Sequence, residues 1–124
     1  MQGILIVEDD AELREMIKTA LVRRKFTIME ASNGKEAVTH FKPLVTDVVI
    51  TNIVMPEDDG LGVIMKLKSV KPKLKIIAMS GGGKASPRHY LDLAKALGAN
   101  ATIIKPFQIN DLIPMVEKFF KRTP

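Results

Sequence analysis

The sequence predicts an α/β fold in which a five-stranded parallel sheet is covered by helices on both faces. Five short apolar runs without polar alternation occur along the chain, at residues 4–7, 28–29, 48–50, 76–79 and 103–104. Such runs are typical of parallel strands that are buried on both faces. The intervening segments carry apolar residues at helical spacing, and strands that alternate with helices favour a doubly wound sheet. We therefore expect one compact domain over residues 1–124.

The first two strand–helix units have clear starts. After the strand at 4–7, Asp10 can cap a helix, and the strand at 28–29 is followed by Asn33 with Glu36 three residues later, a capping-box arrangement. The apolar stripe predicted for the first helix comprises Leu13, Met16, Ile17, Ala20 and Leu21.

The remaining helices follow the last three strands. Asp59 can cap the third helix. The fourth helix is expected to begin at Pro87 and to end before Gly98, because glycine is typical just beyond a helix end. The fifth carries an apolar stripe over 112–120, with Pro114 expected early, where a missing N–H donor costs least.

Composition limits the kind of protein. The chain has no Cys, which excludes disulfides and thiolate metal sites, and it has no apolar run long enough to cross a bilayer. We expect a cytoplasmic protein without a membrane partner. The charge is −4 over residues 1–60 and +9 over 61–124, which indicates either an acidic partner or a solvated lysine-rich helix face. Aromatic residues do not interleave with these lysines, so we expect no direct nucleic-acid binding.

Polar residues follow the ends of four predicted strands. Glu8 and Asp9 follow the first strand, and Asn52, Ser80 and Lys105 follow the third, fourth and fifth. Because ligands bind beyond the carboxyl ends of parallel strands, we expect these side chains to meet in one crevice. Mg²⁺ prefers oxygen ligands such as carboxylates. A hydroxyl, glycine amides and a lysine can donate hydrogen bonds to a phosphoryl group.

These motifs resemble the receiver domains of two-component response regulators, over residues 3–121. The resemblance rests on the residues at 4–10, 55–60, 80–81 and 98–107, in that order along the chain. It implies a flavodoxin-like fold with strand order 2-1-3-4-5. It also implies a signalling protein rather than an enzyme. The implied partners are a sensor histidine kinase or phosphotransfer protein, and a downstream output protein or output domain.

The resemblance also implies roles for single residues. The implied ligands of Mg²⁺ are Glu8, Asp9, Asn52 and the backbone carbonyl of Val54. Ser80 is similar to the switch hydroxyl of these domains, and Lys105 to the lysine that pairs with the acyl phosphate. The Lys105–Pro106 peptide bond is expected to be cis.

The chain departs from the family at two positions. Asn52 stands where the phosphoacceptor aspartate is expected, and an amide cannot form the mixed anhydride. We expect weaker Mg²⁺ binding, because the site loses a negative charge. Thr102 replaces the aromatic residue that commonly acts as the second switch. Asn52 is explained equally by a substituted receiver, a natural pseudo-receiver or an anomaly of this one chain.

Two other functions remain open. The chain can be a phosphorylation-independent interaction module that uses the fourth helix, fifth strand and fifth helix. Its cations are Lys95, Lys118, Lys121 and Arg122. A mononucleotide-binding loop over 80–84 is the third hypothesis, but this run lacks the spacing of a P-loop.

Overall fold

The computed structural model describes residues 2–55, 58–81 and 87–120, and for Met55, Asp58, Asp59 and Pro87 it describes the backbone alone. The strands are β1 (Gly3–Val7), β2 (Thr27–Ala31), β3 (Val48–Asn52), β4 (Val54–Met55), β5 (Asp58–Asp59), β6 (Lys75–Ser80) and β7 (Ala101–Ile104). The helices are α1 (Ala11–Arg23), α2 (Gly34–His40), α3 (Gly60–Val70), α4 (Pro87–Ala96) and α5 (Ile109–Phe119).

Five parallel strands form the main sheet in the order β2-β1-β3-β6-β7. Numbered among themselves along the chain, these strands have the order 2-1-3-4-5, which confirms the prediction. All five run in the same direction, so their carboxyl ends lie at one edge of the sheet. β1 and β3, whose exits carry the acids and Asn52, are direct neighbours.

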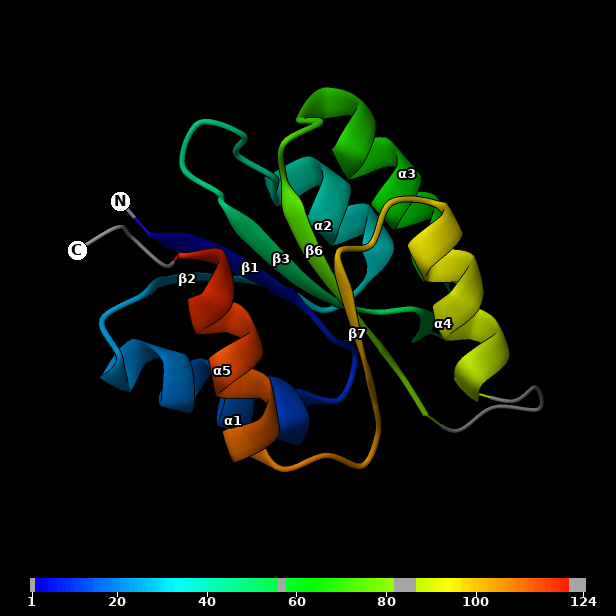
Figure 1. The fold of residues 1–124 in the computed structure, drawn as a ribbon. Helices are drawn as coiled ribbons and strands as arrows, with labels where there is room; N and C mark the ends of the chain where they lie inside the picture. The colour runs from blue at the N-terminus through cyan, green and yellow to red at the C-terminus, as the bar shows by residue number, and fades with distance from the viewer. Residues whose placement is uncertain (1, 56–57, 82–86, 121–124) are drawn as a thin grey trace.

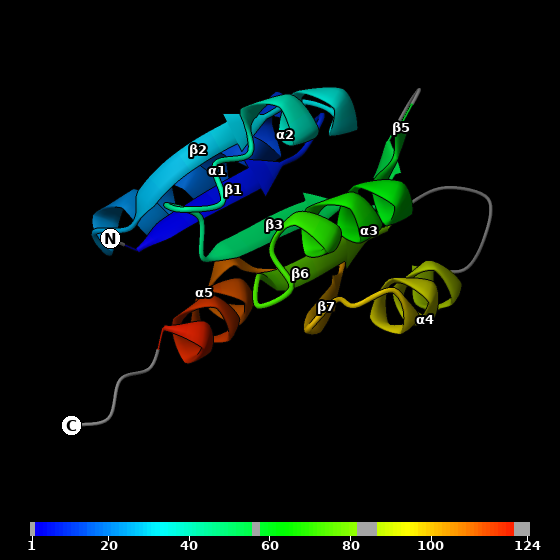
Figure 2. The same ribbon diagram turned by 90° about the horizontal axis from the view of Figure 1, so that it is seen from above.

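Helices cover both faces of the sheet, as Figures 1 and 2 show. α1 and α5 pack on one face, where Ile17 and Leu21 join strand residues such as Ile6 in a buried cluster. α2, α3 and α4 pack on the other face, around Leu5 and Ile64. Successive residues of β1 therefore point into opposite cores, which explains why its apolar run does not alternate. None of the helices in the described ranges combines the length and apolar character needed to cross a membrane.

The helix ends follow the predicted signals closely. Asp10 caps α1 by accepting hydrogen bonds from the backbone N–H groups of the next turn. Asn33 caps α2 through the N–H of Glu36, and the Glu36 carboxylate accepts from the N–H of Ser32, one residue before the expected partner. Gly98 follows α4 with a φ of 119°, a conformation that favours glycine.

The starts of α3 and α5 differ from the predicted ones or could not be tested. Asp59 lies in β5, directly before α3, and its side chain is outside the described part. β5 pairs with β4 in a short antiparallel ladder that the sequence analysis did not predict. Pro114 lies inside α5, which begins at Ile109, and so it is not in the first turn as expected. The helix starts earlier because the Asp111 carboxylate accepts from the N–H of Gln108 and caps this end.

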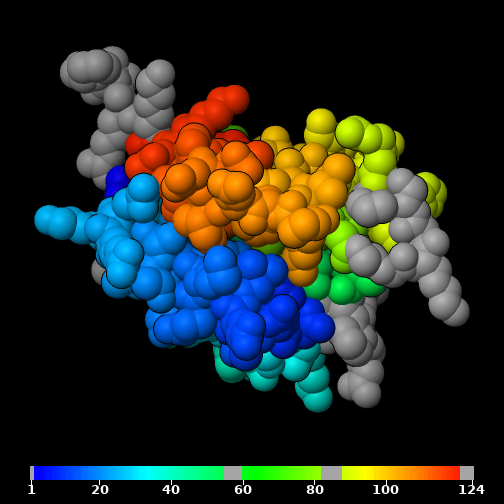
Figure 3. Space-filling view, turned by 90° about the horizontal axis from the view of Figure 1, so that it is seen from below, coloured from blue at the N-terminus to red at the C-terminus, as the bar shows by residue number. Residues whose placement is uncertain are grey.

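Burial differs from the prediction at the sheet edge and on α1. β2 is only partly buried, because it is an edge strand that pairs with β1 alone. Met16 belongs to the predicted stripe but is 55% exposed. It lies in an open groove of about 570 Å³ where α1 meets the start of α5 (Figure 3). The groove is lined by Glu12, Glu15, Met16, Thr19, Ala20, Arg23 and Ile109.

Candidate functional site

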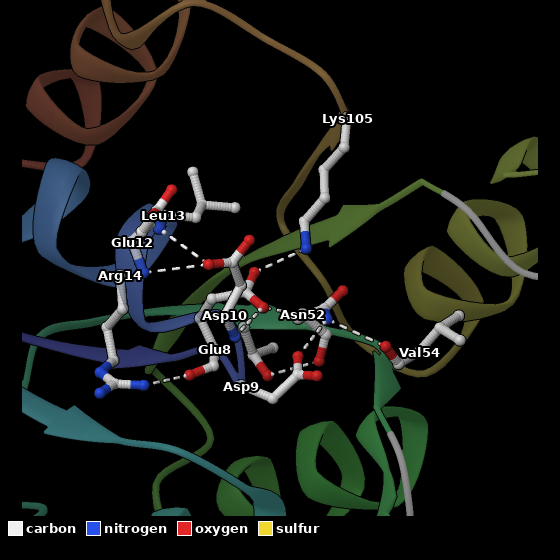
Figure 4. A network of polar contacts seen from close by, with 10 residues as sticks. Glu8, Asp9, Asp10, Glu12, Leu13, Arg14, Asn52, Val54 and Lys105 are labelled. Carbon is white, nitrogen blue, oxygen red and sulfur yellow. Dashed lines mark hydrogen bonds and ion pairs between the residues drawn. The ribbon is translucent and has the colours of Figure 1, made fainter.

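Side chains from distant parts of the chain meet at the carboxyl edge of the sheet (Figure 4). Glu8 and Asp9 follow β1, Asn52 ends β3 and Lys105 follows β7. One hydrogen-bonded network links these four residues to the backbone carbonyl of Val54 in β4. The structure thus brings the polar strand exits into one crevice, as the sheet topology requires.

Glu8 is the centre of this network and is fully buried. Its Oε1 accepts a 2.6 Å hydrogen bond from the Lys105 ammonium. Its Oε2 accepts from the backbone N–H of Asp10 at 3.1 Å. Burial raises the pKa of Glu8, a hydrogen bond with Asp9 raises it further, and Lys105 acts in the opposite direction, leaving the pKa above its ordinary value of 4.5.

Asp9 is more exposed than Glu8, and its pKa moves the other way. Partial burial raises the pKa of Asp9, but hydrogen bonds with Glu8, with its own backbone and with Asn52 together outweigh this effect. The result is a pKa below the ordinary value of 3.8. Asp9 is therefore ionised at neutral pH, and of the two acids Glu8 is the one that binds a proton more readily.

Asn52 presents its amide nitrogen to the acids. The side chain is 4% exposed, and Nδ2 donates to the carbonyl oxygen of Val54 at 2.9 Å, to Asp9 Oδ1 at 3.1 Å and to Glu8 Oε2 at 3.4 Å. Its Oδ1 is buried and has no hydrogen-bond partner among the residues described. The orientation follows from chemistry, because only the NH₂ end of an amide can donate to carboxylates.

Ser80 lies at the edge of the network without joining it. Its Oγ is buried and finds no partner in the described part of the chain, while its carbonyl accepts from the backbone N–H of Lys105 at 2.8 Å. A Cβ on Gly81 would lie 2.5 Å from the Cβ of Lys105, so only glycine allows this close approach. The peptide bond between Lys105 and Pro106 is cis.

Thr102 is remote from these contacts. It lies in β7 opposite Ala78 and is half-buried, and within the described residues none of its side-chain atoms is bonded to the network. Other residues that the sequence analysis named lie outside the described ranges: Gly82, Gly83 and Lys84 of the hypothetical mononucleotide loop, and the cations Lys121 and Arg122.

Arg14 is a site residue that the sequence analysis missed. Its Nη1 donates to the backbone carbonyl of Glu8 at 2.7 Å, and its Nε pairs with Glu30 at the end of β2 at 3.3 Å. It thereby holds the loop that carries Glu8 and Asp9. The signal was its place in the second turn of α1, beside the apolar stripe and close to the β1 exit.

Most of the oxygens that could hold a cation already accept hydrogen bonds from donors of the chain, and the exception is Asn52 Oδ1, which points away from them. Among the described residues there is no group of three or more His, Cys, Asp or Glu side chains placed to hold a metal ion. The oxygens of Glu8, Asp9 and Val54 face the Asn52 nitrogen, and nitrogen bearing two hydrogens cannot ligate a cation. As they stand, these side chains do not fit Mg²⁺.

Comparison with known proteins agrees with this fold. A model of the response regulator receiver domain matches residues 4–117. The chemotaxis protein CheY of Bacillus subtilis is 38% identical over 116 residues, which cover 93% of this chain and 94% of the relative. The response regulator protein TrrA of Thermotoga maritima, in complex with Mg²⁺-BeF, shares 32% identity with a TM-score of 0.81, over 96% of this chain and 99% of that one. A receiver domain protein from Clostridium thermocellum has a TM-score of 0.87 at 26% identity, over 96% and 94%. This chain therefore belongs to the response regulator receiver domains of two-component signalling, whose members are signalling proteins rather than enzymes.

Proposed function

We propose that this chain is a receiver module whose signalling does not pass through phosphorylation of residue 52. The observation that supports the proposal is the buried amide of Asn52 at the end of β3, surrounded by Glu8 and Asp9. Receiver domains interact with histidine kinases and with output domains. We infer that a sensor histidine kinase or phosphotransfer protein, and an output protein or output domain, are the partners of this chain as well.

The chemistry of the amide supports the proposal that residue 52 is not phosphorylated. Transfer to a carboxylate forms an O–P bond as the bond from phosphorus to the donor breaks, and the carboxylate supplies the electron pair. An amide oxygen carries no negative charge and the amide nitrogen is a poor nucleophile. The phosphoryl group therefore has no acceptor at Asn52.

Mg²⁺ is the cofactor that receiver domains generally bind at an acidic site. When bound, it supplies positive charge that offsets the charge of a phosphoryl group. In this chain the residues that the resemblance implies as ligands are Glu8, Asp9, Asn52 and the carbonyl of Val54, and they would hold the ion only after the Asn52 amide turned its nitrogen away from the other three. We propose that Asn52 weakens this binding, because the affinity of hard-cation sites follows the number of charged ligands.

The two switch positions, Ser80 and Thr102, fit a receiver in which a movement of Ser80 is not passed on to the surface. We propose that Ser80 and Lys105 keep the positions at which a phosphoryl group would be held. Thr102 carries no ring that could move between a buried and an exposed position, so it would not transmit a movement of Ser80 to the surface.

Exposure of the protein to Mg²⁺ and acetyl phosphate, followed by intact-mass measurement, tests the proposal. The wild-type chain should gain no stable phosphoryl adduct. The Asn52→Asp variant should gain one, because its carboxylate can displace acetate from phosphorus. Asn110→Asp is the matched control, since it adds a carboxylate at an exposed position of α5 and should stay unmodified. An Asn52→Asp variant that stays inert would show that this site does not perform receiver chemistry.

A second candidate is an interaction module that acts through α4, β7 and α5, and in Figure 1 β7 lies between these two helices. Ile104 of β7 is 41% exposed and Leu93 of α4 is 39% exposed. Lys95 and Lys118 are exposed on the two helices. Apolar side chains together with cations suit a partner that carries acidic and apolar groups.

Affinity capture with matched variants tests this second candidate. A combined Lys95→Glu and Ile104→Ser variant should lose a partner that the wild type retains. Lys25→Glu, on the loop after α1, serves as the control and should retain it. Retention of every partner by the combined variant would exclude this face.

A further inference from the structure

The amide group of Asn52 lies among three oxygens drawn from two segments, the loop after β1 and the start of β4. Its nitrogen lies 2.9 Å from the carbonyl oxygen of Val54, 3.1 Å from Asp9 Oδ1 and 3.4 Å from Glu8 Oε2 (Figure 4). Two N–H bonds serve three acceptors, so at least one hydrogen is shared. A donor surrounded by oxygens in this way makes contacts that a small cation would otherwise make.

The other end of the same amide has no such contacts. Oδ1 is the only Asn52 side-chain atom able to ligate a cation, yet it is buried without a hydrogen-bond partner among the described residues. For Oδ1 to face Asp9 and Val54, the amide would have to turn over. That rotation would break all of the hydrogen bonds from Nδ2 at once.

Groups that belong to the chain offset part of the negative charge of the acids and hydrogen-bond to their oxygens. Lys105 donates to Glu8 Oε1 at 2.6 Å, and its side chain is only 18% exposed. The backbone N–H of Asp10 and the Asn52 amide donate to Glu8 Oε2. Both oxygens of the fully buried Glu8 therefore have donors, and Asp9 receives the amide as well.

From this arrangement we infer that the Asn52 amide takes the place of the divalent cation, so that the carboxylates of Glu8 and Asp9 are held by hydrogen bonds from the chain itself. The domain then holds its folded state and its site geometry independently of Mg²⁺. The inference rests on the proposed function, because it concerns the regulation of the same site. It adds that the site is complete without an ion, whereas the proposed function requires only that Asn52 accepts no phosphoryl group.

Thermal unfolding in EDTA and in millimolar Mg²⁺ tests the inference on the full chain. The transition of the wild type should shift by less than about 1 °C between the two conditions. Asn52→Asp replaces a donor with a third carboxylate, so in EDTA its transition should fall by about 5 °C or more below the wild type, and Mg²⁺ should recover most of that loss. Calorimetric titration should give the variant at least about tenfold tighter Mg²⁺ binding.

Two controls separate the site from general effects of charge. Asn110→Asp adds the same charge on the exposed surface of α5 and should show no Mg²⁺ response. Adding Asp9→Ala to the Asn52→Asp variant removes the more accessible acid and should abolish the response. A double variant that still responds would place the ion elsewhere and overturn the inference.

The outcomes distinguish this inference from the proposed function. A wild type whose transition Mg²⁺ raises by clearly more than about 1 °C would overturn the inference, even if the Asn52→Asp variant accepted a phosphoryl group. The wild-type measurement needs no variant, so it decides the question even if Asn52→Asp failed to fold. An Asn52→Asp variant with the expected Mg²⁺ response but no phosphoryl adduct would support the inference and contradict the proposed function.

Discussion

Replacement of Lys105 by methionine removes the ammonium group that pairs with Glu8 and keeps an unbranched apolar side chain. The pair spans 2.6 Å, Glu8 is fully buried, and Lys105 is 18% exposed. Removing one partner of such a pair leaves an uncompensated charge in the interior, which typically costs about 3–5 kcal/mol. We therefore expect Lys105→Met to lower the free energy of unfolding substantially at neutral pH.

The loss in the free energy of unfolding has an upper limit, because Glu8 can bind a proton and so avoid an unpaired charge. The ordinary pKa of this carboxyl is 4.5. Keeping such a group protonated costs about 1.4 kcal/mol for each pH unit above that pKa, or about 3.4 kcal/mol at about pH 7. The same reasoning gives about 0.7 kcal/mol at about pH 5, where protons are more available. The loss should thus grow with pH, from below about 1 to about 3 kcal/mol.

Urea unfolding at the two pH values, with EDTA present, measures the loss directly. The Glu8→Gln variant provides the reference, because adding Lys105→Met to it should cost little and show no pH dependence. The pairwise term then follows from the double-mutant cycle. An equal loss at both pH values would refute the reasoning, since it would mean that Lys105 contributes through packing alone.

Two more predictions concern groups near the site. Arg14→Ala removes the charged donor to the backbone carbonyl of the buried Glu8, so we expect the free energy of unfolding to fall by about 1.5–3 kcal/mol, against less than about 0.5 kcal/mol for the exposed Arg24→Ala. Similar urea midpoints for both variants would contradict this. The hydrogen bond from the backbone before α2 lowers the pKa of Glu36, so its contribution is fully present above the ordinary value of 4.5 and is lost as the pH falls through the lowered pKa. The difference in stability between the wild type and Glu36→Gln should therefore be largest near neutral pH and shrink in acid, and a difference that stays constant in acid would refute it.

The fold could be predicted because its main determinants are local. The run at β1 reports burial on both faces, and Asp10 and Asn33 act as caps through hydrogen bonds to their own next turn. The partial burial of β2 could not be predicted in this way, because its sequence does not indicate that the strand pairs with one neighbour only. For the same reason Met16 matched the apolar stripe of α1 and still lies exposed.

The site was predictable in position and less so in detail. Glu8, Asn52 and Lys105 could be placed together because parallel strands bring their carboxyl ends to one edge. The direction of the Asn52 amide depends on two acceptors in the loop after β1 and one at Val54, and no spacing along the chain encodes this combination. For Arg14 the sequence offered only its position near the β1 exit, because its acceptor is a backbone carbonyl that no residue type identifies.

Asparagine and aspartate have nearly the same shape, and this gives the buried side chain of Asn52 a consequence for evolution. The residue is only 4% exposed, and aspartate would fill the same volume. On the function proposed above, a single codon change at this position adds or removes the phosphoryl acceptor while Glu8, Asp9 and Lys105 stay in place.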